Sequence, residues 1–187
     1  MPGNLALTDG IVQIRPFQED DLHPFHAAIR ESLDMLIPWM SWAHPAYSEK
    51  EAADYIRMAR NGWDAGTLFV FAICDARDAT MLGAVSLSHI HPVYHFCNLG
   101  YWVRASRRGN GLAGRAARLA ARFGFERTGL IRAEVVVAVG NEASLRVAEK
   151  SGAHREGILR NRITVRADIH DAVMFSFVPA DFATAPL

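Results

Sequence analysis

The sequence has little cysteine, no long apolar run and no net charge. Its two cysteines, Cys74 and Cys97, stand alone in strand-like segments, which predicts small core residues rather than a disulfide or a metal pair and fits a reducing cytoplasm. No apolar run approaches the roughly 20 residues that a membrane span needs, and no basic-then-apolar leader opens the chain. We therefore expect a cytoplasmic protein with no membrane segment and no signal peptide.

The zero net charge hides a segregation along the chain. Residues 1–103 hold 6 basic and 12 acidic side chains, whereas residues 104–166 hold 14 basic and 5 acidic ones. This separation suits a polyanionic small ligand at one end of the molecule and a cationic partner near the other, although solvated helix faces would also account for single arginines. A nucleic-acid-binding domain is usually more basic overall, so nucleic acid is not an expected partner.

Hydrophobic spacing predicts one domain over residues 1–187, with elements in the order β-α-α-α-β-β-β-α-β-α-β-β. Ser48 and Glu51 form a capping box at one helix start, and Asn141 caps a helix over residues 142–151. A second short helix or turn is expected at residues 33–37, before Pro38. The valine-rich run at 131–139 predicts a strand buried on both faces. The expected class is α/β, a mixed and largely antiparallel sheet with helices on both faces.

The stretch S-R-R-G-N-G-L-A-G at residues 106–114 lies between a strand-like segment and a helical pattern. The first turn of a helix carries free N–H groups and the positive end of a dipole, and arginines add charge-assisted hydrogen bonds. We therefore predict an anion site, most simply for a pyrophosphate. The turn follows the fourth expected strand and lacks a neighbouring lysine, which excludes a dinucleotide fingerprint and a Walker loop.

Four motifs in the right order resemble those of the GNAT N-acetyltransferases, and within them the Rim type that acetylates ribosomal-protein N-termini. They are the glycine turn preceded by L-G-Y-W-V at 99–103, the run N-E-A-S at 141–144 with E-K-S-G-A at 149–153, E-G-x-x-R at 156–160, and H-D at 170–171. Ser106 departs from the family's first turn residue. The resemblance covers nearly the whole chain and implies that the fourth and fifth strands splay apart to admit acetyl-CoA.

The same resemblance implies roles for individual residues. Backbone groups of Trp102, Val103 and Arg104 would meet the acetyl-pantetheine arm, with Asn141 on its other side. Ser144 corresponds to a serine that protonates the departing thiolate, although an ordinary helix serine would look the same. The pyrophosphate cradle would consist of Arg108, Gly109, Asn110, Gly111, Leu112, Ala113 and Gly114.

The general base is less evident. Acetyl transfer needs a neutral amine, an oxyanion stabiliser such as a backbone N–H near Val103, and a proton for the thiolate. Rim-type members often have glutamates where this chain has Asn98 and Ile163. We take His89 and Glu156 as catalytic candidates; His91, His170, a water chain or entry of a neutral amine are the alternatives. The spacing of the histidines at 89, 91 and 95 matches no zinc pattern, so no metal is expected.

Trp39 and Trp42 follow Pro38 in a turn between helices, where they would wall an acceptor cleft or simply join the core. Together these features predict an N-acetyltransferase that moves the acetyl group of acetyl-CoA to a primary amine, such as a protein N-terminal α-amine, by direct attack. The alternative is a catalytically silent CoA-binding sensor with the same fold. Relatives are often dimeric, so a homodimer is a possible assembly.

Overall fold

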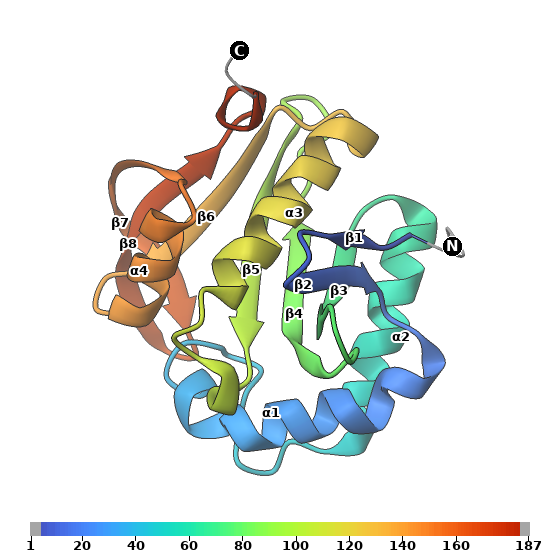
Figure 1. The fold of residues 1–187 in the computed structure, drawn as a ribbon. Helices are drawn as coiled ribbons and strands as arrows, with labels where there is room; N and C mark the ends of the chain where they lie inside the picture. Colours follow the sequence, from blue (N-terminus) through green and yellow to red (C-terminus); the bar gives the residue numbers. More distant parts are fainter. Residues whose placement is uncertain (1–4, 184–187) are drawn as a thin grey trace.

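An eight-stranded sheet in the order β1-β2-β3-β4-β5-β6-β8-β7 runs through the protein (Figure 1). The computed structural model describes residues 5–183; residues 1–4 and 184–187, which the single-domain prediction includes, lie outside this part. The strands are β1 (Leu7–Thr8), β2 (Val12–Pro16), β3 (Phe69–Asp75), β4 (Met81–Ser88), β5 (Phe96–Val103), β6 (Arg132–Ala138), β7 (His154–Val165) and β8 (Asp168–Phe177). The helices are α1 (Leu22–Leu36), α2 (Glu49–Ala65), α3 (Leu112–Thr128) and α4 (Glu142–Lys150).

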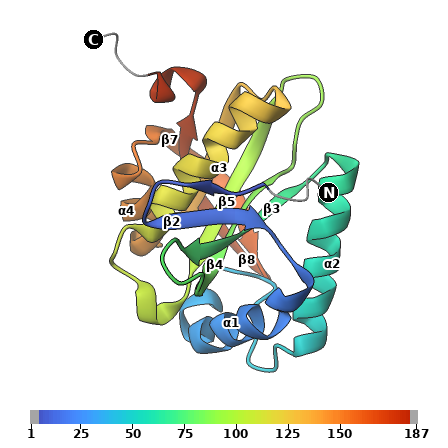
Figure 2. The same ribbon diagram turned by 45° about the vertical axis from the view of Figure 1, so that its right-hand side comes forward.

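The sheet is mixed, with helices on both faces. Among the described strands, β5 and β6 form a parallel pair and all other neighbours are antiparallel. Helices α3 and α4 lie against one face, and α1 and α2 cover part of the other (Figures 1 and 2). The predicted fold class is therefore confirmed. Because the short strand β1 was not expected, the predicted fourth and fifth strands are β5 and β6.

Two apolar cores lie on either side of the sheet. Alternation along β3 sends Phe71 toward α3 and Val70 toward α1 and α2, and both side chains are buried. In β6 the face toward α3 is buried at Val135 and Val137, whereas the other face is only partly buried at Val136 and becomes buried at Ala138. The predicted burial on both faces is therefore incomplete, because the second face is covered less closely than the one against α3 and α4.

Local signals set the helix ends as expected. Ser48 accepts a hydrogen bond from the Glu51 N–H and the Glu51 carboxylate accepts one from the Ser48 N–H, so the capping box is confirmed. The separate short helix or turn predicted at residues 33–37 is instead the last turn of α1, which continues unbroken to Leu36. Ile37 keeps helical backbone angles as the C-cap, so nothing divides this turn from the rest of the helix before Pro38.

Both cysteines are core residues, as predicted. Cys74 is 1% exposed and Cys97 is fully buried, and they lie in different cores. Burial raises the pKa of the Cys97 thiol to about 12 and raises that of Cys74 as well, because a thiolate is poorly solvated there. Both side chains are therefore packed as neutral thiols.

Gly83 in β4 provides a test of how closely β4 and β5 pack. Its φ is +156°, and a Cβ there would lie 2.1 Å from the Trp102 carbonyl oxygen. Gly83→Ala should therefore lower the free energy of unfolding by about 1–3 kcal/mol, measured by urea denaturation. Gly100→Ala, whose Cβ would make ordinary contacts with Ser86 Oγ at 3.6 Å and Asn98 Nδ2 at 3.9 Å, is the matched control and should be neutral or slightly stabilising. Equal stability of the two variants would contradict this account.

Candidate active site

The parallel strands β5 and β6 separate soon after they begin to pair. Their ladder runs only from Phe96–Arg132 to Asn98–Glu134, yet β5 continues to Val103 and β6 to Ala138. Figure 1 shows the two strands close at their upper ends and apart at their lower ends. The predicted splay of the fourth and fifth strands is confirmed. Beyond Asn98, the edge of β5 that faces β6 forms no ladder and is available to an extended ligand.

The glycine turn presents bare backbone at the start of α3. The chain leaves β5 through a 3-10 turn at Ala105–Arg107 and enters α3 at Leu112. Gly109 and Gly111 have φ values of +81° and +71°, which glycine adopts without strain, and a Cβ at either position would meet no atom within 4 Å. Such a turn offers N–H groups and the positive end of the α3 dipole to an anion.

A cavity of about 1200 Å³ joins this turn to the splayed strands and to the end of α1. Its wall therefore combines residues from distant parts of the chain, and most of the predicted site residues share it. Those that line the cavity are Trp39, Trp102, Val103, Arg108, Gly109, Gly111, Leu112, Ala113, Gly114, Asn141 and Ser144.

The outer part of the cavity is strongly basic. Two of the arginines of α3 that line it are held in place by neighbours. Arg115 donates to Asp9 Oδ2 at 2.8 Å, and Arg118 donates to the Ser151 carbonyl at 3.0 Å while its guanidinium lies over the Phe182 ring at 4.6 Å. This wall suits a polyanion such as a phosphorylated cosubstrate. The further cations that line the cavity are Arg107, Arg108, Arg122, Arg146 and Lys150.

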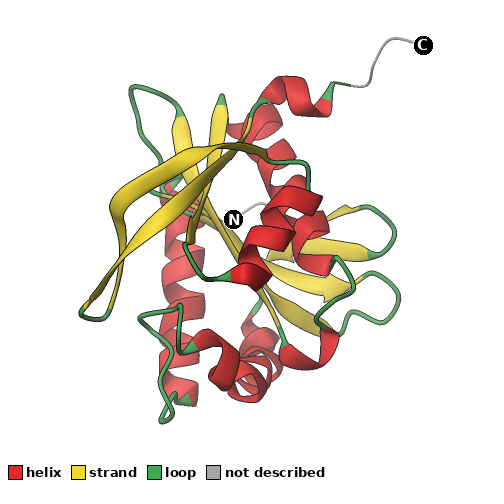
Figure 3. Ribbon diagram, turned by 90° about the vertical axis from the view of Figure 1, so that its left-hand side faces the viewer, coloured by secondary structure: helices red, strands yellow, loops and turns green. Residues whose placement is uncertain are grey.

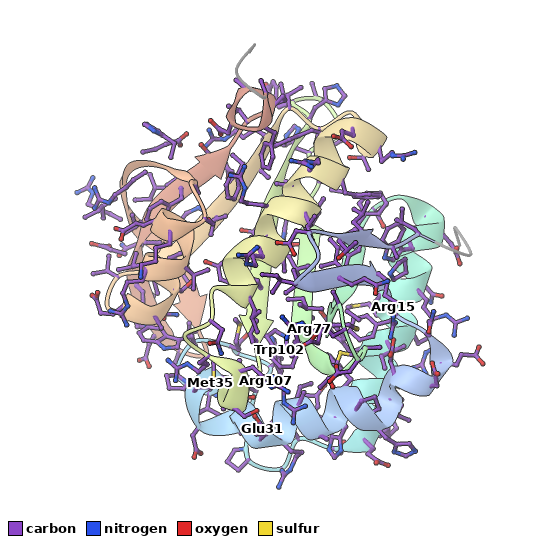
Figure 4. All side chains as sticks on the ribbon, viewed as in Figure 1. Arg15, Glu31, Met35, Arg77, Trp102 and Arg107 are labelled. Carbon is purple, nitrogen blue, oxygen red and sulfur yellow. The ribbon has the colours of Figure 1, made fainter. Side chains whose placement is uncertain are left out.

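Helix α1 holds the glycine turn through hydrogen bonds of Glu31 and Ser32, here called the Glu31 clasp. Glu31 accepts hydrogen bonds from Arg104 Nε at 2.9 Å and from the Ser106 N–H at 2.7 Å, and Ser32 Oγ accepts from the Ala105 N–H at 3.0 Å. Hydrogen bonding by Arg104 lowers the pKa of Glu31 to about 2. Figure 4 shows Glu31 near Arg107 where α1 meets the end of β5. These hydrogen bonds hold the glycine turn against α1.

A pair of hydroxyl groups spans the gap between the splayed strands. Tyr101 on β5 places its phenol oxygen 3.3 Å from Ser144 Oγ and 3.3 Å from the Ser144 carbonyl oxygen on α4. The Asn141 side-chain oxygen accepts the Ser144 N–H at 3.2 Å, which caps α4 and fixes Ser144 at its first turn. Burial raises the pKa of Tyr101 to about 12, so its hydroxyl stays protonated.

Residues 37–47, here called the tryptophan loop, close the other end of the cavity. Trp39 lines it and lies against the ring of His170, with centroids 6.3 Å apart. Arg166, at the tip of the β7–β8 hairpin, donates to the carbonyls of Ile37 at 2.8 Å and Ala43 at 2.7 Å. Figure 3 shows this hairpin as a long bent arm. Its tip therefore fixes the loop from outside.

Three predicted binding residues do not line the cavity. The Arg104 N–H donates to the Leu82 carbonyl at 2.7 Å, and its side chain is held by Glu31, so it braces the turn instead of facing an arm between the strands. Asn110 points its amide back to carbonyls of the turn. Trp42 is 38% exposed, with its ring 6.4 Å from that of Trp102.

The two predicted base candidates lie away from the cavity wall. His89 is exposed beyond the end of β4, where its Nδ1 is 3.1 Å from Ser88 Oγ. Glu156 forms two 2.6 Å hydrogen bonds with Arg132, and this contact lowers the pKa of Glu156 to about 2. A carboxylate held so firmly as an anion is a weak base, so the catalytic role of Glu156 stays a prediction that this geometry does not favour.

Tyr101 and the cations of α4 line the cavity, and Glu31 holds its glycine turn, but none of them is among the predicted site residues. Alternation along β5 could have placed Tyr101 on the α3 side with Leu99 and Val103. No local signal marks Glu31, whose partners lie 73 and 75 residues further along the chain. Within residues 5–183, no three His, Cys, Asp or Glu side chains are grouped to hold a metal ion, and no helix is long and apolar enough to cross a membrane.

The splayed strands β5 and β6 and the bare glycine turn at the start of α3 are the features expected of a CoA-dependent acyltransferase. The chain belongs to the GNAT acetyltransferase family: the model of the acetyltransferase (GNAT) domain matches residues 12–154. Members of this family use acetyl-CoA, and the protein is an N-acetyltransferase. Family membership and relatives named as N-acetyltransferases favour the enzyme over the silent CoA-binding module.

Similar proteins span nearly the whole chain. The "Putative ribosomal N-acetyltransferase YdaF" of Bacillus subtilis (strain 168) is 28% identical over 178 residues, which are 91% of this chain and 93% of that protein. The spermidine N(1)-acetyltransferase of Escherichia coli (strain K12) is 24% identical over 163 residues, 87% and 83% of the two chains. The fold matches that of RimL, a ribosomal L7/L12 α-N-protein acetyltransferase solved with coenzyme A, with a TM-score of 0.84, 19% identity and coverage of 93% and 98%.

The Glu31 clasp leads to a prediction about pH. Because the folded-state pKa of Glu31 lies near 2, below its usual 4.5, its ionised form stabilises the fold above about pH 4.5, and this contribution disappears as the pH falls toward 2. Glu31→Gln should lower the free energy of unfolding by on the order of 1 kcal/mol at pH 7, and by less at pH 3. It should also weaken acetyl-CoA binding severalfold in calorimetry.

The control for this prediction is Glu126→Gln, on the exposed face of α3 away from the turn. That variant should match the wild type in both measurements. A Glu31→Gln protein that binds acetyl-CoA as tightly as the wild type would show that the clasp does not position the turn.

Proposed function

We propose that the enzyme transfers the acetyl group of acetyl-CoA to a primary amine, and that its acceptor is the α-amine of a protein N-terminus. The observation that carries this proposal is the single cavity that runs from the glycine turn, past the splayed strands, to the tryptophan loop. A cavity that holds the thioester at one end and opens to an acceptor at the other permits direct attack by the amine, without an acylated enzyme.

The cosubstrate fits the residues of this cavity. The pyrophosphate would lie on the backbone of Gly109–Gly114, with Arg108 adding a charge-assisted hydrogen bond. The pantetheine arm would extend along the free edge of β5 at Trp102 and Val103, as an added strand does. Because Asn141 uses its side-chain oxygen to cap α4, its amide nitrogen is left to donate to the arm.

The thioester would then lie beside Tyr101 and Ser144. A backbone N–H near Val103 would stabilise the negative charge that develops on the carbonyl oxygen. As the C–N bond forms and the C–S bond breaks, the Ser144 hydroxyl would supply a proton to the sulfur. Tyr101 stays protonated and lies 3.3 Å from Ser144 Oγ, so it supports the donor role of that hydroxyl.

The acceptor assignment is supported by the opening and by the relatives. Trp39 and Met40 line the cavity at its acceptor end, and Trp42 lies beside Trp102, so aromatic rings would flank an incoming peptide. The YdaF name points to ribosomal substrates, whereas the spermidine enzyme makes a polyamine the second candidate. We further propose that the chain acts as one domain in the cytoplasm, alone or as a homodimer.

An acceptor panel with detection of released CoA tests the proposal. A peptide with a free N-terminus should be acetylated with a kcat/KM at least about tenfold higher than spermidine or the same peptide with a blocked N-terminus and an internal lysine, a difference of about 1.4 kcal/mol in transition-state binding. Preference for spermidine would reject the N-terminal acceptor. Release of CoA with none of the amines would reject the proposed reaction.

Arg166 provides a separate test of the acceptor end. Arg166→Ala removes both hydrogen bonds to the tryptophan loop, so the KM for the amine should rise severalfold while the Kd for acetyl-CoA stays unchanged. Arg162→Ala, an exposed neighbour on the same hairpin, is the matched control. An equal rise in both constants for Arg166→Ala would mean that the hairpin tip supports the whole fold and not the acceptor end.

A further inference from the structure

A row of polar residues crosses the sheet at the rung where β5 and β6 begin to separate. The register pairs Asn98 with Glu134 across these two strands and Glu134 with Ser176 on β8. Paired residues point to the same face of a sheet. Their chain neighbours, such as Leu99 and Val135, are buried against α3, so the row projects from the opposite face. The two ends of the row are Ser88 on β4 and His154 on β7.

This face is the acceptor side of the molecule. Trp102 follows Asn98 on β5 at an even-numbered position, so it projects from the same face, and its ring lies beside that of Trp42 in the tryptophan loop. On β8, His170 likewise shares a face with Ser176 and contacts Trp39. The polar row and the residues that contact the tryptophan loop therefore project from the same face of the sheet.

The cavity itself offers no evident base for that amine. Among its lining residues the one carboxylate is Asp9, which is paired with Arg115 at the basic outer end, and no histidine lines the wall. An α-amine has a pKa near 7.7–8.0 and is largely protonated at pH 7. A proton acceptor near the closed end of the gap is therefore needed at neutral pH.

Glu134 is the carboxylate on the last rung of the β5–β6 ladder, where the gap begins. Arg132 donates from Nε to Glu134 Oε1 at 2.9 Å, and both of its amino groups are bound by Glu156, whose Oε1 also accepts from Ser176 Oγ at 2.7 Å. Arg132 thus holds Glu134 by one oxygen only. Two carboxylates share one guanidinium, which leaves one negative charge in the cluster. The Glu134 side chain is 16% exposed, enough to meet water.

We propose that Glu134 is the general base of the acetyl transfer, acting through water on the ammonium of the acceptor. This inference rests on the proposed function. One proton passes from the ammonium through water to Glu134 and then to solvent. The neutral amine attacks the thioester, the C–N bond forms, the C–S bond breaks, and the second proton of the nitrogen replaces the one that Ser144 gives to sulfur. The products are an N-acetyl amide, CoA thiol and one released proton.

The geometry separates the two proton transfers. Tyr101 and Ser144 serve the sulfur from the α4 side, whereas Glu134 serves the nitrogen from the acceptor side. Asn98 lies three residues from Tyr101, about 10 Å along the strand, so bridging water is required between Glu134 and the amine. Glu156 is a positioning residue in this scheme, because it holds the guanidinium that orients Glu134. The charged or titratable groups around Glu134 are Arg132 on β6, Glu156 and His154 on β7, and the buried thiol of Cys97 on β5.

The test is the pH dependence of a Glu134→Gln variant with a free-N-terminus peptide. At pH 7 its kcat/KM should fall about 100-fold, the range that general bases contribute. The deficit should shrink to a few-fold by about pH 9.5, where the amine is already neutral. The Kd for acetyl-CoA should stay within about twofold of the wild-type value, because Glu134 does not line the cavity. Glu126→Gln is the control and should match the wild type at every pH.

A second variant keeps the proposal testable if Glu134→Gln folds poorly. Asn98→Glu combined with Glu134→Gln returns a carboxylate to the same rung and face, and it should recover at least about tenfold of the lost activity at pH 7. A Glu134→Gln deficit that is constant across pH, or an activity equal to wild type, would overturn the assignment. Wild-type protein that acetylates no amine would instead overturn the proposed function, and with it the role of Glu134.

Discussion

The early end of the β5–β6 ladder is the constraint on which the active site depends. A strand edge inside a protein carries N–H and C=O groups that need partners, and here an extended thioester arm would provide them. The alanine face of α3 lies tightly against the sheet above the gap, with Ala116, Ala117, Ala120 and Ala121 fully buried.

Helix α1 ties the two ends of the site together. Glu31 and Ser32 hold the glycine turn, and one helical turn later Met35 and Leu36 line the cavity before the chain enters the tryptophan loop. A displacement of this helix would move the glycine turn and the start of the tryptophan loop together. The hairpin tip at Arg166 fixes the far side of the same loop, so the acceptor end is braced from both sides.

The features that could be predicted from the sequence are those encoded by near neighbours. The Ser48–Glu51 box, the Asn141 cap and the glycine turn each need only a few residues, and all three have the predicted local structure. The splay of β5 and β6 was predicted from the resemblance to a family, and the cosubstrate site stays a prediction from the same resemblance. The contacts that no local pattern encodes were missed: Tyr101 reaches Ser144 over 43 residues, and Glu31 reaches Arg104 over 73. Glu156 was singled out for its charge, but its pairing with Arg132 is visible only in the fold.

The burial of both cysteines has a consequence for the fate of the product. The RimL structure contains a disulfide between CoA and a cysteine, whereas here neither Cys74 nor Cys97 lines the cavity and both thiols are held neutral in the core. Because the thiolate is the species that attacks a disulfide, oxidised CoA has no partner on the native protein. The enzyme should therefore keep its activity under oxidative conditions that inactivate proteins with an exposed thiol beside their cosubstrate. A thiol-reactive dye added during turnover would report free CoA alone, without a background from the folded chain.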